Sequence, residues 1–258
     1  MDCDWSFNGQ TGIITGAASG IGAELARLLA KSDAELALVD RDRRRLDAVV
    51  TECTNLAQNN SLVKPLAICA DMSKPEDIQR MIDATLASFG KINFLVTSAG
   101  IIYRSRFLDI DLAEWDEVMA TNVRGVFLCN QMVVAQMLKQ GGGRIVNISS
   151  VAGRSISLIG GAHYCTSKHA VVGMTRHMAR ELCQQGIRAN VFCPGATHTP
   201  MIHDNMDADE VKGLEQRIAL GRLADADEQA RVIAFMLSDA ASYLNGACLD
   251  SNGGSVML

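Results

Sequence analysis

The sequence is short of positive charge, and this shortage excludes a class of partner. Its 29 Asp and Glu side chains outnumber its 24 Lys and Arg, which leaves a formal net charge of -5 at pH 7. Proteins that bind nucleic acid or an anionic membrane surface present a basic patch instead. The one dense basic cluster, residues 41–45, is short and is interrupted by Asp42. We therefore expect neither nucleic acid nor a membrane as a partner.

Long apolar runs, a secretory start and paired cysteines are lacking as well. No apolar stretch approaches the roughly 18 residues that a membrane-spanning helix requires. The first residues, MDCDWSFNGQ, have no cationic start followed by an apolar run, so we expect no secretory signal. The 8 cysteines stand singly, without a Cys-x-x-Cys pair, and several fall in strand-like runs where a free thiol behaves as a small hydrophobe. These features favour a reduced, cytoplasmic protein.

The chain also has no proline-rich or serine-rich linker, no low-complexity segment and no detectable internal repeat. Its 258 residues are 48% hydrophobic and 21% charged, as in a globular protein with a sizeable core. We expect a single domain over residues 1–258, with one long irregular segment at about residues 194–223.

Short β-rich runs alternate with longer helical patterns along the chain. The expected strands are nearly all apolar, as in a parallel sheet covered by helices on both faces, and they are Gly12–Thr15, Glu35–Val39, Pro65–Cys69, Ile92–Thr97, Arg144–Ser149, Ile187–Cys193 and Ala247–Asp250. The expected helices are Ile21–Lys31, Arg43–Asn55, Pro75–Phe89, Leu112–Lys139, Tyr164–Gln184 and Asp227–Ser238. This alternation predicts a single doubly wound α/β fold built on one parallel seven-stranded sheet.

Local signals mark several helix ends. The stretch SKPE at residues 73–76 has the form of a capping box with a proline in the first turn. Asp111 followed by Glu114 marks the start of the fourth helix, and QGGGR at residues 140–144 marks its end.

The first strand runs directly into TGAASGIGAELARLL, residues 15–29, whose glycines are Gly16, Gly20 and Gly22. Glycine permits a tight turn and a close approach of the backbone to a pyrophosphate, and the following helix points its N–H groups at the anion. A strand-to-helix turn without a ligand is the competing interpretation. The second strand ends at Asp40, about 20 residues on, where a carboxylate can accept hydrogen bonds from an adenosine ribose.

The residues around Asp40 bear on the choice of cofactor. Its carboxylate would repel a ribose 2′-phosphate and so favours NAD over NADP. Arg41 and Arg43 favour the phosphate instead, because a guanidinium binds it well. Asp40 stands at the strand end itself, so NAD is the expected cofactor. A purely structural role for Asp40, capping the next helix, is compatible with this one.

Further motifs follow the middle strands, where parallel sheets place their chemistry. The fourth strand ends in TSAG at residues 97–100, the fifth in NISSVAG at 147–153, and the sixth runs into CPGATHTPM at 193–201. Tyr164 and Lys168 follow the fifth strand closely and lie one helical turn apart, so their side chains share a face. All these segments can converge on one cleft.

From end to end, the motifs resemble those of classical short-chain dehydrogenases/reductases. The matching stretches occur in the family's order and are TGAASGIG (15–22), AG (99–100), NVRG (122–125), ISSVAG (148–153), YCTSK (164–168), PGATHTP (194–200), GRLADADEQARVIAFMLSD (221–239) and GG (253–254). The resemblance implies a Rossmann-like sheet in the strand order 3-2-1-4-5-6-7. It also implies an NAD(P)-dependent enzyme that interconverts a secondary alcohol and a ketone by hydride transfer.

The same resemblance implies catalytic roles for Tyr164, Lys168, Ser150 and Asn122. Tyr164 would exchange the proton of the substrate hydroxyl, and a nearby ammonium and nicotinamide cation would lower its ordinary pKa of about 10. Ser150 would hydrogen-bond the substrate oxygen as charge develops there. Asn122 would hold a water that connects Lys168 to solvent.

The cofactor would lie along the strand ends. By the resemblance its binding residues are Gly16, Ser19, Ile21, Gly22, Asp40, Arg41, Asp71, Met72, Ala99, Gly100, Tyr164, Lys168, Pro194, Gly195, Thr197 and Thr199. The segment at about residues 194–223 would cover a small-molecule substrate. The helices Leu112–Lys139 and Tyr164–Gln184 would pack between the subunits of a dimer or tetramer.

Three features depart from the family pattern. Thr97 and Ser98 replace two asparagines after the fourth strand, although Ser98 can still hydrogen-bond locally. The serine stands 14 residues before the tyrosine instead of the family's 13, and the match of SSVAG selects Ser150 over Ser149. Asn252 replaces a common aspartate, which would alter a subunit contact.

Histidine and cysteine near the tyrosine do not predict a metal site. His163, His169 and His177 share its helix, but their spacings of 6 and 8 do not form a metal-binding pair. Cys165 adjoins Tyr164 and is interpreted as a packing residue.

Two alternatives stay open. One is an NADPH-dependent ketoreductase of the 3-oxoacyl reductase type in a biosynthetic pathway. The other is a non-catalytic nucleotide-binding regulatory protein, against which the four retained catalytic residues argue. A polyol, a hydroxy acid, a steroid and an acyl thioester fit the sequence about equally well as substrates.

Overall fold

A parallel sheet of seven strands organises the protein. The computed structural model describes residues 6–57 and 64–258, so Cys3 lies outside the described residues. The strands are β1 (Thr11–Thr15), β2 (Glu35–Asp40), β3 (Leu66–Cys69), β4 (Phe94–Thr97), β5 (Gly143–Ile148), β6 (Ile187–Pro194) and β7 (Cys248–Ser251). Their order is β3-β2-β1-β4-β5-β6-β7, and every neighbouring pair is parallel. The predicted fold and strand order are confirmed.

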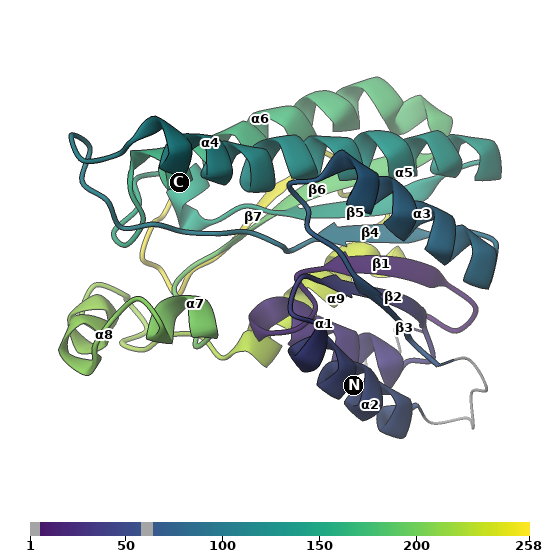
Figure 1. Cartoon of the computed structure of the whole chain (residues 1–258), viewed down its shortest axis with the longest axis horizontal. Coiled ribbons are helices and arrows are strands. Elements are labelled where there is room, and N and C mark those ends of the chain that lie inside the picture. Colours follow the sequence, from purple (N-terminus) through teal and green to yellow (C-terminus); the bar gives the residue numbers. More distant parts are fainter. Residues whose placement is uncertain (1–5, 58–63) are drawn as a thin grey trace.

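Helices cover both faces of the sheet (Figure 1). One face packs on α1 (Gly20–Ala30), α2 (Arg43–Leu56) and α9 (Ala226–Leu237), and the other on α3 (Pro75–Phe89), α5 (Val126–Gln140) and α6 (Ala162–Leu182). Neighbouring residues of β1 show the alternation, because Ile14 is buried against the first set and Ile13 against the second. Strands that are buried on both sides must be apolar throughout, which is why the sequence pattern identified them.

The strand order places a cleft at the carboxyl ends of the central strands. From β1 the chain turns first to β2 and β3 on one side, and β4 then begins the other half of the sheet. Connections therefore leave β1 and β4 in opposite directions, which is the topological switch point where open α/β sheets bind ligands. Of the helices in the described ranges, none combines the length and the apolar character needed to cross a membrane.

The fourth predicted helix is not uniform. It consists of α4 (Leu112–Met119), a π-helical turn over Ala120–Gly125, and α5, which ends at Gln140 before Gly141 in the left-handed region. Gly125 packs against the backbone of the loop between β3 and α3, since a Cβ on Gly125 would come within 2.1 Å of the carbonyl oxygen of Met72. The wider turn accommodates this close approach and carries Asn122 into the interior.

The capping prediction at residues 73–76 is wrong in one respect. The first residue of α3 is Pro75, as expected, but its N-cap is Lys74 and no side chain caps the helix there. The hydroxyl of Ser73 donates instead to the carboxylate of Asp71 at 2.8 Å. At α4 the prediction is confirmed, because the carboxylate of Asp111 accepts from the N–H of Glu114 at 2.8 Å.

The segment predicted to be irregular contains two short helices, α7 (Pro200–His203) and α8 (Ala208–Glu215). Figure 1 shows them at the same end of the molecule as α4 and the C-terminus. A capping box stabilises the start of α8. The side chains of Asp207 and Glu210 each accept a hydrogen bond from the backbone N–H of the other residue.

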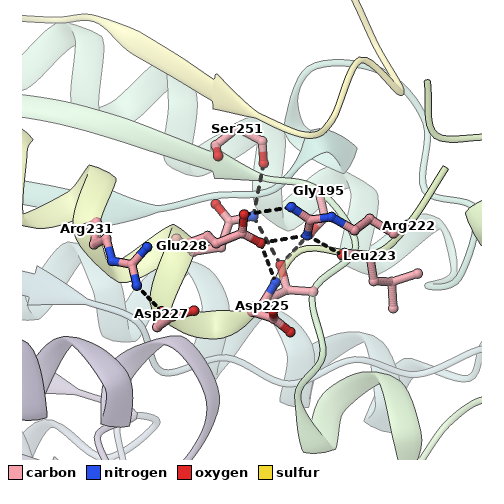
Figure 2. A network of polar contacts seen from close by, with 10 residues as sticks. Gly195, Arg222, Leu223, Asp225, Asp227, Glu228, Arg231 and Ser251 are labelled. Atoms are coloured by element: carbon pink, nitrogen blue, oxygen red, sulfur yellow. Dashed lines mark hydrogen bonds and ion pairs between the residues drawn. The ribbon is translucent and has the colours of Figure 1, made fainter. Parts of the chain in front are cut away.

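A polar network ties the end of this segment to α9 (Figure 2). The guanidinium of Arg222 donates to both carboxylate oxygens of Glu228 at 2.7 Å. Glu228 also accepts from the backbone N–H of Asp225 at 2.9 Å, and these bonds lower its pKa to about 2, with Arg222 as the larger cause. The next residue, Gln229, donates to the carbonyl of Ser251 in β7 at 3.1 Å. The segment, α9 and the last strand are therefore held together.

Candidate active site

A cavity of about 570 Å³ opens at the carboxyl ends of the central strands. It is lined by nearly all the residues predicted to bind cofactor or substrate, namely Gly16, Ser19, Ile21, Asp40, Arg41, Asp71, Met72, Ala99, Gly100, Ser150, Tyr164, Lys168, Pro194, Gly195, Thr197 and Thr199. Gly22 and Asn122 are the predicted residues that do not line it. The structure thus brings together segments that are far apart in the sequence.

The glycine loop between β1 and α1 forms one end of the cavity. Gly16 has a φ of 69°, and a Cβ there would lie 2.7 Å from the backbone nitrogen of Ala99, so only glycine fits. A Cβ on Gly22 would lie 2.2 Å from the carbonyl oxygen of Gly16. Gly22 therefore allows α1 to pack against the loop, and it lies behind the cavity instead of lining it.

The N-terminus of α1 suits a phosphate. Ser19 is its N-cap, but no side chain caps this helix, and the first-turn N–H groups of Gly20 and Ile21 have no intrahelical carbonyl as partner. Ser19, Gly20 and Ile21 all line the cavity. Free N–H groups and the positive end of the helix dipole together favour an anion here, so the residues present fit the pyrophosphate of a dinucleotide.

Asp40 supports the loop from the end of β2. Its carboxylate accepts from the N–H of Ala18 at 3.1 Å and from that of Asp42 at 3.0 Å. The cap of α2 is Asp42, which accepts from the N–H of Arg45 at 3.0 Å, so the structural alternative for Asp40 as the helix cap is wrong. Each oxygen of Asp40 keeps a second lone pair, and the residue borders the cavity.

The arginines near Asp40 differ from the expectation. Arg43 is ion-paired with Asp47 at 2.8 Å on the outer side of α2 and does not line the cavity. Arg41 and Arg45 do line it, and Arg45 lies 3.4 Å from the carboxylate of Asp42. Arg45, and not Arg43, is the second cation at this end.

Tyr164 and Lys168 both line the cavity, from the first two turns of α6. Both are buried, with exposed fractions of 7% and 6%. The ammonium nitrogen of Lys168 lies 5.7 Å from the centre of the Tyr164 ring and donates to the carbonyl of Ile148 at 3.1 Å. Burial lowers the pKa of Lys168 to about 8.

Burial has the opposite effect on the tyrosine. It raises the pKa of Tyr164, and the hydrogen bond with the hydroxyl of Ser150 lowers it by less. The lowering of this pKa by the ammonium together with the nicotinamide cation stays a prediction, and in the protein without cofactor desolvation of the phenolate outweighs the effect of Ser150. The protein alone keeps Tyr164 protonated at neutral pH.

The two serines at the end of β5 have separate roles. Ser150 accepts from the N–H of Ala152 at 3.1 Å, lines the cavity beside Tyr164 and lowers the pKa of that tyrosine. The hydroxyl of Ser149 donates to the backbone carbonyl of Lys168 at 2.8 Å and so joins β5 to α6. The choice of Ser150 as the residue beside the tyrosine is in keeping with these contacts.

Asn122 lies just behind the cavity and is fully buried. Its amide accepts from the N–H of Ile101 and donates to the carbonyl of Ile101, both at 2.9 Å. Gly100 lies between Asn122 and Lys168. A Cβ on Gly100 would come within 3.3 Å of Oδ1 of Asn122 and 3.5 Å of Nζ of Lys168, so a side chain there would crowd both groups. The π-helical turn therefore places an amide next to the ammonium, with a glycine leaving the space between them open.

The far end of the cavity was only partly predicted. Three segments line it, contributing Ile101, Ile102 and Tyr103, then Ser157, Leu158 and Ile159, and then Met201, Ile202, Asn205, Leu214, Arg217 and Ile218. The sequence predicted only the third of these, as part of the segment at about residues 194–223, and Met206 of that segment packs on a cluster containing Ile202 and does not line the cavity. The first two segments carry no motif or periodicity, so the sequence had no signal for them.

Four further side chains, those of Cys165, His198, His203 and Asn252, make structural contacts. The thiol of Cys165 lies 3.2 Å from the carbonyl oxygen of Ala152, in keeping with a packing role. The rings of His198 and His203 stack on each other at the surface, with centroids 5.4 Å apart. Asn252 closes a turn within its own chain, donating to Val256 O and accepting from Gly254 N, both at 2.9 Å. Within the described ranges all cysteines are free, and no three His, Cys, Asp or Glu residues form a group that could hold a metal.

Comparisons with known proteins agree with this geometry. A family model described as enoyl-(acyl carrier protein) reductase matches residues 16–255. D-threitol dehydrogenase of Mycolicibacterium smegmatis is 35% identical over 98% of this chain and 95% of its own length. A 3-oxoacyl-[acyl-carrier-protein] reductase of Thermotoga maritima is 36% identical over 97% of this chain and 99% of its own length.

Solved structures superpose closely. Levodione reductase has a TM-score of 0.89 and 36% identity, over 96% of this chain and 98% of its own. A 3-ketoacyl-(acyl-carrier-protein) reductase from Brucella melitensis, complexed with NADH, has a TM-score of 0.89 and 31% identity, over 98% and 100%.

The buried lysine leads to a stability prediction. Replacing Lys168 by methionine should raise the free energy of unfolding at pH 7 by about 1–3 kcal/mol, because it removes a desolvated cation and loses one hydrogen bond. The folded-state pKa of about 8 lies below the ordinary 10.5, so the cation destabilises wild type below pH 8 and this penalty disappears as the pH rises toward 10.5. Urea unfolding at pH 7 and pH 9 should show the gap between the two proteins narrowing. A gap that is constant or widens with pH would contradict the assignment.

Proposed function

The chain belongs to the short-chain dehydrogenase/reductase family and is an NAD(P)-dependent oxidoreductase that acts on a small molecule, and from this we propose that it interconverts a secondary alcohol and a ketone with Tyr164 as general acid and base. The observation that carries the proposal is a pair of hydroxyls, Tyr164 and Ser150, that line the strand-end cavity beside the buried amine of Lys168, with Ser150 lowering the pKa of Tyr164. A hydroxyl pair in this setting can hold one substrate oxygen from two sides.

Each residue has a definite task in this proposal. The nicotinamide ring of the bound cofactor supplies the hydride acceptor or donor. Tyr164 takes the proton from the substrate hydroxyl when the alcohol is oxidised and returns it when the ketone is reduced. Ser150 donates a hydrogen bond to the same oxygen and stabilises the charge that develops on it. Lys168, held by the carbonyl of Ile148, stabilises the phenolate from the face of the ring.

Proton supply is the proposed role of Asn122. Gly100 has no side chain between the Asn122 amide and the Lys168 ammonium, and the proposal places a water there that hydrogen-bonds to both. With its pKa of about 8, Lys168 is able to exchange a proton near neutral pH. The proposed proton path runs from Tyr164 past Lys168 and Asn122 toward solvent.

The acid–base assignment is tested by removing one oxygen. Tyr164→Phe keeps the ring that packs over Lys168, so cofactor binding should be retained, while turnover falls by at least about 100-fold because the proton partner is gone. NADH binding followed by fluorescence, and steady-state rates over a broad alcohol and ketone panel, measure the two quantities. Unchanged turnover in the variant would show that another group exchanges the proton.

We propose NAD as the preferred cofactor, with the residues at the end of β2 as the reason. The Asp40 carboxylate lines the cavity, where it would accept hydrogen bonds from ribose hydroxyls and repel a 2′-phosphate. Arg41 and Arg45 act in the other direction, although Asp42 partly neutralises Arg45. A relative bound to NADH, the Brucella melitensis reductase, supports the same choice.

This preference is tested by binding measured with both cofactors. Wild type should bind NADH more tightly than NADPH, and Asp40→Ala should shift the ratio of the two Kd values toward NADPH by about tenfold or more, since it removes the repelling charge. Arg43→Ala is the matched control, because Arg43 pairs with Asp47 away from the cavity, and it should leave the ratio unchanged. Tighter binding of NADPH by wild type would favour the biosynthetic ketoreductase alternative.

The walls of the far end favour a substrate with an apolar body. Isoleucine, leucine and methionine side chains make up most of its lining, and Arg217 is its charged residue among the described ones. A polyol would leave its hydroxyls without partners against such walls, which costs binding energy. We therefore propose a compact apolar ketone or its alcohol as the substrate, with a 3-oxoacyl thioester as the second candidate, because an acyl chain suits the same apolar lining.

A substrate panel followed by cofactor absorbance separates these classes. Cyclic and branched ketones should have a kcat/KM at least about tenfold above that of any four-carbon polyol in the reverse direction. A 3-oxoacyl thioester that exceeds the simple ketones would select the second candidate. A polyol as the best substrate would contradict the reading of the apolar walls.

We also propose that the protein works as a homo-oligomer in the cytoplasm. The helix α5 carries Phe127 and Leu138 with exposed rings and methyl groups, which a second subunit would cover. The segment at residues 194–223, with α7 and α8, is proposed to cover the substrate.

A further inference from the structure

His163, the residue directly before Tyr164, is fully buried, and both of its ring nitrogens have partners. Nδ1 lies 2.8 Å from the backbone nitrogen of Tyr164, and Nε2 lies 2.6 Å from a carboxylate oxygen of Glu114 in α4. A backbone N–H can only donate, so Nδ1 accepts and carries no proton. The ring proton is therefore on Nε2 and is donated to Glu114. His163 is a neutral imidazole in a single tautomer, fixed from both sides.

This arrangement supplies a missing helix cap. The N-cap of α6 is Gly161, which has no side chain, and the N–H of Tyr164 in the first turn has no intrahelical carbonyl to bond. A capping side chain cannot stand at position 161, because a Cβ there would lie 2.6 Å from the carbonyl oxygen of Ser105 and 2.8 Å from the His163 ring. The imidazole of His163 takes over that function for the one N–H that belongs to Tyr164.

Glu114 extends the same network to the wall of the cavity. Its second carboxylate oxygen accepts from the hydroxyl of Ser105 at 2.8 Å. In the same loop, two residues before Ser105, the carbonyl of Tyr103 accepts from the N–H of Gly161 at 2.8 Å. One carboxylate therefore holds α4, the start of α6 and the loop whose residues 101–103 line the far end of the cavity.

The position of Tyr164 makes this support important. First turns of helices fray, and a small rotation at the Tyr164 Cα is amplified at the hydroxyl, at the far end of a rigid ring. A misplacement of about 1 Å at the reacting atom can cost about 100-fold in rate. Neither His163 nor Glu114 lines the cavity, so neither contacts substrate or cofactor there.

We propose that His163 and Glu114 form a positioning pair that holds the first turn of α6 and keeps the Tyr164 hydroxyl beside Ser150. The inference rests on the proposed function, in which Tyr164 exchanges the proton. The two residues come from elements 49 positions apart in the sequence, and their bond is made without any contribution from the reacting groups.

Two substitutions of one residue separate the two bonds. In His163→Asn the amide oxygen replaces Nδ1 at the same distance from Cα, so the cap on the Tyr164 N–H is kept and the contact with Glu114 is lost. In His163→Gln the longer side chain keeps its reach toward Glu114 but has a carbon, Cδ, where Nδ1 was, so it cannot accept from the Tyr164 N–H there. His177→Gln is the matched control, an exposed histidine of the same helix that pairs with Glu181.

The expected results depend on whether each variant keeps a partner for the Tyr164 N–H and on whether it keeps the bond to Glu114. His163→Gln should lower kcat by about tenfold or more, with KM and the NADH Kd within about threefold of wild type, because the pair positions the acid–base group and does not bind ligand. His163→Asn should recover only part of that loss, because it restores the cap on the Tyr164 N–H but not the bond to Glu114, and His177→Gln should match wild type. Should His163→Gln fail to fold, Glu114→Leu carries the same test, since it frees the ring and should lower kcat with KM retained.

Other outcomes overturn the proposal. Folded variants with an unchanged kcat would show that the pair has no positioning role, and losses spread equally over kcat, KM and Kd would show a general structural role. Tyr164→Phe in the same assay separates this failure from failure of the proposed function. If that variant is inactive while His163→Gln is fully active, only the positioning inference is wrong; if Tyr164→Phe is active, the proposed function fails first.

Discussion

The burial of an amine beneath a tyrosine ring is the constraint on which the site depends. Removing the Lys168 ammonium from water lowers its pKa to about 8, so its charge is unfavourable unless the surroundings compensate. The carbonyl of Ile148, freed at the end of β5, provides one partner, and the face of the Tyr164 ring provides another. The end of a central strand is one of few places in a globular protein where a buried backbone carbonyl is available to such a group.

Much of the neighbouring structure serves to keep that amine in place. Ser149 bonds the backbone of Lys168 to β5, and Gly153 has no room for a Cβ, which would lie 2.6 Å from the Lys168 carbonyl oxygen. The π-helical turn brings Asn122 behind it, and His163 holds the start of the same helix. Because these supports come from the segment after β5, the π-helical turn between α4 and α5, and α6, the site requires the complete fold and not just the helix that carries the Tyr-x-x-x-Lys motif.

The parts of this arrangement that the sequence predicted are those with a regular spacing or a strong local cause. Strands buried on both faces appear as apolar runs, and the glycines at 16, 20 and 22 stand where the backbone turn allows no side chain. The errors have tertiary causes. Ser73 does not cap α3 because its hydroxyl bonds to Asp71, and the π-helical turn depends on the approach of Gly125 to Met72, which lies far away in the chain. The sequence did not predict the bond between His163 and Glu114, because the two residues are 49 positions apart and no local pattern connects them.

The central claim is that the protein alone disfavours the tyrosinate and that cofactor charge makes it accessible. The sequence contains 3 tyrosines, so Tyr164 can be followed by NMR of protein labelled at the tyrosine Cζ carbon, with Tyr164→Phe giving the assignment. The pKa of Tyr164 should lie above its ordinary value of about 10 in the free protein and should fall when NAD saturates the site. A pKa below that value in the free protein, or one that NAD leaves unchanged, would contradict the account.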